Sequence, residues 1–84
     1  MSAPIARSPQ QLGRLVQRFR RDAGLNQTQL AQLSGQRQEM ISKIETGQGG
    51  VKLSTIYEVL AALNLEIIIA PRTRSSSADI ETIF

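Results

Sequence analysis

The chain of 84 residues contains no cysteine, no histidine and no tryptophan. Without cysteine it has neither a disulfide framework nor a thiolate metal site, and without histidine it lacks the commonest general base and metal ligand. Its serine and acidic residues form no recognisable nucleophile–base arrangement, and no glycine-rich loop stands between a strand and a helix to hold nucleotide phosphates. The sequence therefore argues against an enzyme and predicts no cofactor and no metal.

Long apolar runs are also missing. Runs such as Val59 to Leu63 and Ile67 to Ala70 are far too short to span a membrane, and the N-terminus does not resemble a signal peptide. We therefore expect a cytoplasmic protein with no membrane partner. Ten lysine and arginine residues exceed seven acidic ones, for a net charge of +3, which is consistent with a polyanionic partner. A chain this short makes one small domain with little core, which favours pairing with a second copy.

Two short helical patterns lie at the centre of the chain, separated by a turn at Gly35. The first covers Gln27 to Leu33, with Asn26 as its N-cap and Gln29 completing a capping box. Glycine takes the left-handed conformation that ends a helix. The second pattern covers Gln38 to Glu45. The spacing predicts two helices in tandem.

The second helix has an unusual outward face. Ile41 and Ile44 are three residues apart and point inward, whereas Gln38 and Ser42 are four apart and point outward. An ordinary solvated helix shows lysine and glutamate there. Amides and hydroxyls suit the edges of base pairs in a major groove, and glutamine bonds adenine at two atoms.

The stretch from Leu25 to Gly47 resembles the helix-turn-helix of the phage-repressor-like (Cro/C1, or XRE) family. It matches the family pattern of Leu-x-Gln-x-x-Leu-Ala, a small-Gly turn and Ile-Ser-x-Ile-Glu-x-Gly. The resemblance implies a mainly α, lambda-repressor-like domain of four helices, with the second of the tandem helices entering a major groove of double-stranded DNA. It also implies an ion pair between Arg20 and Glu45 that ties the first helix to the recognition helix.

Roles for single residues follow from their positions. Gln38 is assigned to adenine, Glu39 is tolerable near DNA if it accepts from a cytosine amino group, and Lys43 reaches either guanine or a phosphate. Met40 belongs to the core or touches a thymine methyl. The base-contacting set is Gln38, Glu39, Ser42 and Lys43. Phosphate contacts, which set register but not sequence, are assigned to Gln27, Arg37 and Lys52.

The flanking segments predict two further helices. Ser8 as N-cap and Pro9 at the first helical position begin a helix that ends near Ala23–Gly24. Apolar residues at helical spacing predict another helix from Leu53 to Leu63, which ends at Asn64. The expected core residues are Leu12, Leu15, Val16, Phe19, Leu30, Ala31, Leu33, Ile41, Ile44, Leu53, Ile56, Val59, Leu60 and Leu63.

The segment from Leu65 to Pro71 departs from the phage-repressor pattern, which continues with another helix. Its consecutive isoleucines predict a single C-terminal β-strand. A lone strand leaves its backbone unpaired, so we expect two protomers to pair their copies across a homodimer. The pairing residues are Leu65, Ile67, Ile68 and Ile69. A helix-turn-helix followed by such a strand is similar to HipB-type antitoxins, which implies a HipA-like serine/threonine kinase toxin as partner. The same resemblance implies a bacterial protein that is associated with the nucleoid in the cytoplasm.

The expected domain organisation is therefore a flexible arm (1–7), a DNA-binding domain (8–64), a dimerisation strand (65–71) and a flexible tail (72–84). The tail is polar but ends in Ile80, Ile83 and Phe84. In HipB-like antitoxins the tail can reach the toxin, so these three residues form either a docking element or an unstructured terminus.

Three functions remain open at this point. The resemblance favours an antitoxin that represses its own HipBA-type operon through a palindromic operator and neutralises the kinase toxin. A stand-alone repressor without a toxin is the first alternative. A protein-interaction module that reuses the helix-turn-helix shape is the second.

Overall fold

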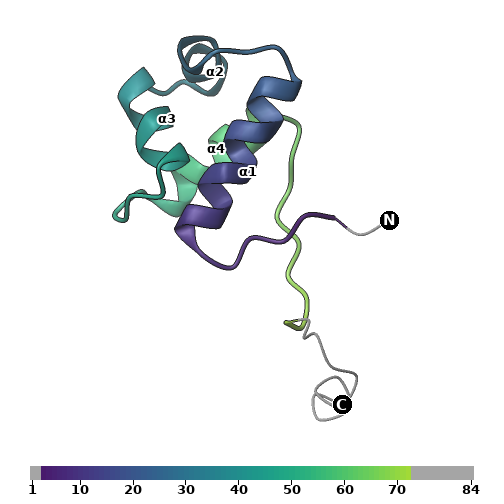
Figure 1. Ribbon diagram of the computed structural model, residues 1–84. Coiled ribbons are helices and arrows are strands. Elements are labelled where there is room, and N and C mark those ends of the chain that lie inside the picture. The colour runs from purple at the N-terminus through teal and green to yellow at the C-terminus, as the bar shows by residue number, and fades with distance from the viewer. Residues whose placement is uncertain (1–2, 73–84) are drawn as a thin grey trace.

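The computed structural model describes residues 3–72, which contain four α-helices in the order that the sequence predicts (Figure 1). They are α1 (Pro9–Asp22), α2 (Gln27–Ser34), α3 (Gln38–Glu45) and α4 (Leu53–Ala62). No helix within this range is long and apolar enough to cross a membrane. The mainly α fold class is confirmed.

Local chemistry sets where the helices begin. The Gln11 N–H donates to Ser8 Oγ over 3.1 Å at the start of α1, and Pro9 occupies the first helical position. At α2 the capping box is complete: Asn26 Oδ1 accepts from the Gln29 N–H, and Gln29 Oε1 accepts from the Asn26 N–H, each over 2.8 Å. Each bond satisfies a donor that has no partner within the helix.

Residues with positive φ stand where the helices end. Gly35 follows α2 with φ 71°, and the next N–H, that of Gln36, donates to the Ala31 carbonyl over 2.8 Å. Asn64 follows α4 with φ 58°, as the sequence predicts. After the turn at Gly35, α3 packs against both α1 and α2, while α4 packs against α2.

All four helices contribute to one small core. Its buried apolar residues are Val16, Leu30, Ala31, Ile41, Ile44, Val59 and Leu60. Two expected members, Leu15 and Phe19, are half-buried and are neither part of this core nor packed against it. Two others are wrong: Leu33 and Leu53 are each 62% exposed. Leu33 lies next to the end of α2 and Leu53 begins α4, so both lie at the margin of the packed face, where periodicity no longer decides burial.

The predicted strand does not form within residues 3–72. Residues 65–72 follow α4 without regular secondary structure and run away from the helices, on the same side of α1 as the segment that precedes α1 (Figure 1). A strand is defined by hydrogen bonds to a neighbour, and a single chain supplies none here. The predicted residues Ile80, Ile83 and Phe84 lie outside the described residues.

Gly13 allows α1 to lie directly on the end of α3. A Cβ at this position would be 2.6 Å from the Glu45 carbonyl oxygen and closer still to that of Ile44. Both neighbours are backbone atoms, which cannot move aside cheaply. The close crossing of α1 and α3 therefore depends on the missing side chain.

We expect Gly13→Ala to lower the free energy of unfolding by about 1–3 kcal/mol despite the better helix propensity of alanine, because the crossing must open. Gly49→Ala is the matched control, since nothing lies within 4 Å of its Cβ position, and it should change stability by less than about 0.5 kcal/mol. Urea unfolding measures both. Equal stability of the two variants would contradict the crossing described here.

Candidate nucleic-acid interface

The two faces of α3 differ as the sequence predicts. Ile41 and Ile44 are buried, Gln38 is exposed, and Ser42 is half-buried. Of the remaining base-contacting candidates, Glu39 is exposed and Lys43 half-buried. The first turn of α3 thus offers an amide and a carboxylate to solvent, and the second turn a hydroxyl and an ammonium group. Such a face can donate and accept hydrogen bonds at the edges of bases.

The phosphate candidates stand at the starts of three helices. Arg37 and Lys52 are exposed N-cap residues of α3 and α4, and neither side chain bonds its own helix. Gln27 is the first residue of α2. Helix N-termini present backbone N–H groups and a positive partial charge, which favour phosphate. The contacts with DNA themselves stay predictions.

The ion pair implied by the family resemblance is present. Arg20 Nε donates to Glu45 Oε2 over 2.6 Å, and Nη2 donates to Oε1 over 3.1 Å. The third guanidinium nitrogen, Nη1, donates to the Leu25 carbonyl over 2.8 Å. The Arg20 side chain is 9% exposed and that of Glu45 is 1% exposed. The pair therefore fastens α1, the connection to α2 and the last residue of α3 together inside the protein.

A second set of contacts was missed by sequence reasoning. Gln27 Nε2 donates to Glu45 Oε1 over 3.1 Å, and Gln38 Nε2 donates to Gln27 Oε1 over 2.5 Å. The side chain expected at a phosphate thus bridges the buried carboxylate and the leading amide of α3. One feature could have indicated it: two glutamines begin helices that the turn at Gly35 brings together.

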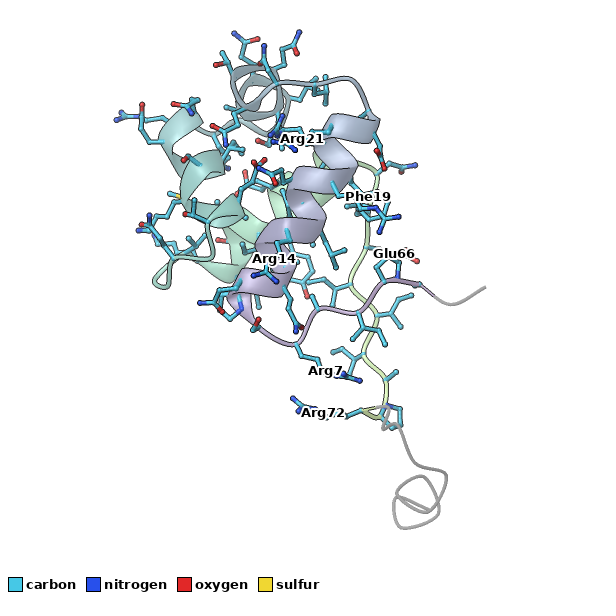
Figure 2. The ribbon with its side chains drawn as sticks, in the orientation of Figure 1. Arg7, Arg14, Phe19, Arg21, Glu66 and Arg72 are labelled. Atoms are coloured by element: carbon cyan, nitrogen blue, oxygen red, sulfur yellow. The ribbon has the colours of Figure 1, made fainter. Side chains whose placement is uncertain are left out.

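The arginines of α1 other than Arg20 are exposed. Figure 2 shows Arg14 and Arg21 on the surface of this helix. The guanidinium group of Arg18 lies 5.9 Å from the centroid of the Phe19 ring, within the range of a cation–π contact. They raise the positive potential of the domain without forming part of the α3 face.

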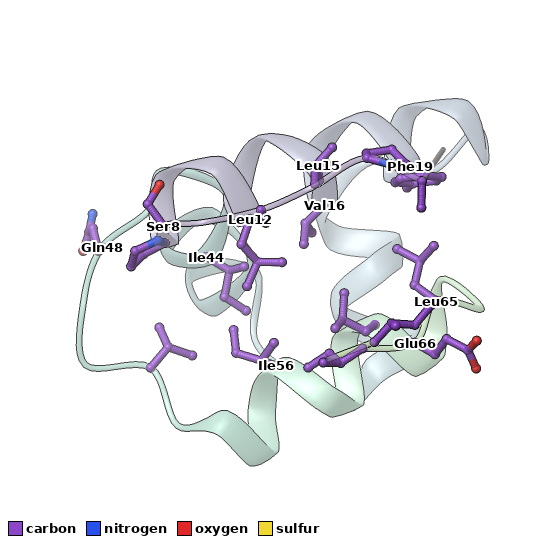
Figure 3. Close-up of a pocket in the computed structure, with 18 of the residues that line it drawn as sticks. Ser8, Leu12, Leu15, Val16, Phe19, Ile44, Gln48, Ile56, Leu65 and Glu66 are labelled. Carbon is purple, nitrogen blue, oxygen red and sulfur yellow. The ribbon is translucent and has the colours of Figure 1, made fainter. Parts of the chain in front are cut away.

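An apolar groove of about 780 Å³ is a second feature of the surface. Its walls come from residues 3–9, from α1, from Ile44 of α3, from the connection between α3 and α4, from α4, and from the segment after α4 (Figure 3). Leu12, Leu15 and Phe19 of α1 face Ile56 of α4 and Leu65 across it. Of the predicted strand residues, Ile67 and Ile68 line its edge at 40% and 71% exposure, and Ile69 is 93% exposed.

Residues 16–68 match the family model described as helix-turn-helix (HTH_3). The chain therefore belongs to this family of DNA-binding transcription regulators, which are not enzymes. A curated relative, an uncharacterised HTH-type transcriptional regulator of Haemophilus influenzae, is 42% identical over 52 residues. That match covers 62% of this chain and 53% of the relative, so the chain spans about half of the relative's length.

Several solved structures of helix-turn-helix proteins are similar to this chain. A HipB chain in a complex with an "O2 20mer" is 28% identical with a TM-score of 0.78, over 86% of this chain and all of that chain. A chain of the "HipA-HipB-O2-O3 complex" is 28% identical with a TM-score of 0.75, over 82% of this chain and 97% of that chain. The restriction-modification controller protein C.AhdI of Aeromonas hydrophila is 33% identical with a TM-score of 0.64, over 69% of this chain and 84% of that chain. The similarity to HipB-type chains expected from the sequence is confirmed.

We expect Arg20→Ala to lower the free energy of unfolding by about 3–5 kcal/mol, because the variant leaves the Glu45 carboxylate buried without its cationic partner. The neighbouring exposed arginine provides the control, and Arg21→Ala should stay within about 0.5 kcal/mol of the parent chain. Chemical denaturation followed by circular dichroism compares them. Matching midpoints for the two variants would show that the ion pair contributes nothing to holding α3.

Proposed function

We propose that the protein is a sequence-specific repressor that inserts α3 into the major groove of operator DNA. The observation that carries the proposal is the composition of the exposed α3 face, where Gln38 and Glu39 stand at the end of the helix at which base contacts concentrate. Ser42 and Lys43 continue the face along the groove. Arg37, Lys52 and the start of α2 then contact phosphates on either side. We propose the nucleoid in the bacterial cytoplasm as the place of action, which the DNA target and the likeness to a regulator of Haemophilus influenzae support.

We further propose that two protomers bind a palindromic operator. The segment after α4 supports this, because Ile68 and Ile69 are largely exposed beside an apolar groove, and exposed apolar surface of this kind marks an interface. In the proposed dimer the two copies of Leu65 to Ile69 pair as antiparallel strands. The recognition helices then lie about 34 Å apart, one turn of DNA.

The finer proposal is an antitoxin of the HipBA type, which also binds and neutralises a serine/threonine kinase toxin. Its support is the likeness to HipB chains over most of this chain, one of them in a complex with HipA. The tail, with Ile80, Ile83 and Phe84, is the proposed docking element. A stand-alone repressor is the second candidate, supported by the likeness to the controller protein C.AhdI. A kinase-like gene beside this one favours the antitoxin, and its absence favours the repressor.

We expect Gln38→Ala to weaken binding to the cognate operator by about 1–3 kcal/mol and to relax selectivity at one base pair. Lys52→Ala, which removes a proposed phosphate contact, should instead weaken all duplexes alike and reduce the salt dependence of binding. Both are measured by fluorescence anisotropy on operator variants at several salt concentrations. Parent-like affinity and selectivity of Gln38→Ala would show that this face does not read DNA.

We expect Ile68→Lys to raise the dissociation constant of the homodimer at least about tenfold, because burial of an isoleucine stabilises by roughly 1.5–3 kcal/mol. Leu33→Lys is the control, since Leu33 is a similarly exposed apolar residue on α2 that takes no part in the proposed pairing. Sedimentation equilibrium measures both. A parent chain that stays monomeric at all concentrations, or an Ile68→Lys dimer as tight as the parent's, would refute the proposed interface.

A further inference from the structure

The apolar groove beside α1 is not filled by the part of the chain that the structure describes. Leu15 and Phe19 lie on its α1 wall, half-buried, and neither packs against the core. Ile56 of α4 and Leu65 face them across the groove (Figure 3). The groove has a volume of about 780 Å³, which suits a compact apolar group. Apolar walls of this extent, left in contact with water, indicate an interface.

Apolar side chains of the kind that fill a groove occur in the part of the chain outside the described residues. Residues 73–84 are mostly polar but contain Ile80, Ile83 and Phe84, which we call the tail stripe. These three have the i, i+3, i+4 spacing of one face of a helical turn, and short amphipathic segments contact apolar grooves through such a face. A tail that only solubilised the protein would not need them.

The proposed pairing of two protomers directs each tail toward the groove of the other. When Leu65 to Ile69 pair with their copies in antiparallel order, the two-fold axis passes at Ile67, and Ile69 lies opposite the partner's Leu65. Leu65 is itself a groove residue. Each tail therefore leaves the paired strands at the edge of the partner's groove. Within a single chain, by contrast, residues 65–72 run away from the helices (Figure 1).

The chain between the paired strand and the tail stripe is long enough for this contact. Ile80 follows Ile69 by eleven residues, which span at most about 36 Å when extended. The α1 wall of the groove runs from Leu12 to Phe19, a distance of about 10 Å along a helix. The connecting residues can therefore place Ile80 at any point along this wall.

The charges beside the groove complement those of the tail. The guanidinium group of Arg18 lies 5.9 Å from the centroid of the Phe19 ring, and Arg18 makes no ion pair within the described residues. Asp79 and Glu81 stand on either side of the first residue of the tail stripe. Glu66 also lines the groove, and its charge repels acidic residues from that end. The charges thus favour one orientation, with the acidic residues of the tail near Arg18.

We propose that the groove of each protomer holds the tail stripe of the partner, so that the two tails are exchanged across the dimer. The proposal rests on the dimer proposed above and adds a second contact to it, between the tail and α1. The tail stripe is also the proposed docking element for a toxin. A toxin that binds it has to draw the tail out of the groove, which couples toxin binding to the stability of the dimer.

Disulfide cross-linking between two full-length single-cysteine variants tests the exchange, since the chain contains no cysteine. One is Leu15→Cys, on the groove wall and outside the core, and the other is Ile83→Cys, in the tail stripe, with a tag that changes its mass. In an equimolar mixture with oxidised glutathione, we expect the tagged–untagged dimer to form at least about tenfold faster than with Leu33→Cys in place of Leu15→Cys. Leu33 is the matched control because it is an exposed leucine outside the groove.

A chain that carries both Leu15→Cys and Ile83→Cys shows in which direction the tail docks. Exchange predicts a covalent dimer on a non-reducing gel. A disulfide within one chain, found in the monomer band, would show that the groove holds its own tail and would overturn the exchange. Equal cross-linking rates for the Leu15→Cys and Leu33→Cys mixtures would show that the tail does not occupy the groove at all. Circular dichroism of each variant confirms that the helices are intact.

Sedimentation equilibrium separates failure of the exchange from failure of the dimer. We expect Ile83→Ser to raise the dissociation constant of the dimer about tenfold, because an apolar side chain no longer leaves water on association. Thr82→Ser, at the neighbouring tail position outside the stripe, should leave the constant unchanged. A parent chain that stays monomeric refutes the proposed dimer and the exchange with it. A parent that dimerises no more tightly than Ile83→Ser refutes the exchange alone.

Discussion

The buried ion pair between Arg20 and Glu45 is the constraint on which the rest of the structure depends. Two charges have been removed from water, and their mutual bonds and the Leu25 carbonyl compensate that cost only while α1, α2 and α3 keep their relative positions. Gly13 makes this possible, because it lets α1 come close enough to the end of α3 for the two side chains to meet. The last residue of α3 is thereby anchored, while the first turn of the helix projects into solvent.

Most of the fold could be predicted from the sequence, because its boundaries are determined locally. Ser8, Asn26, Gly35 and Asn64 act through the hydrogen bonds and backbone angles of their own helix ends, so their residue types are informative without the tertiary structure. Burial at the helix margins was predicted less well. Whether Leu33 is buried depends on what packs beyond the end of α2. The periodicity of residues within α2 gives no information about that packing. The prediction of a strand after α4 was not met for a related reason. The partner proposed for that strand is a second chain, which a single chain does not supply.

The candidate site shows the same division. The exposed face of α3 follows from residue spacing, and the Arg20–Glu45 pair was predicted only through the family resemblance. The bond between Gln27 and Gln38 was not predicted, because the two residues lie eleven positions apart and meet only through the angle that the turn at Gly35 sets between α2 and α3. The sequence assigned Gln27 to a phosphate and Gln38 to a base, as if neither side chain contacted the other. Packing instead joins the two side chains through a hydrogen bond.

The division between the helix-turn-helix and the chain beyond α4 also bears on function. A shared fold does not determine a shared role, and the similar structures include both HipB chains and a restriction-modification controller protein. In the proposed function, the α3 face decides which bases a single protomer reads. In the proposed dimer, the groove and the segment from Leu65 to Ile69 decide how two protomers are joined, and hence the spacing and symmetry of the half-sites that they bind together. Two proteins with the same recognition helix therefore select different operators if these segments differ. Under the function proposed for this chain, the exposed isoleucines therefore carry as much information about the operator as Gln38 does.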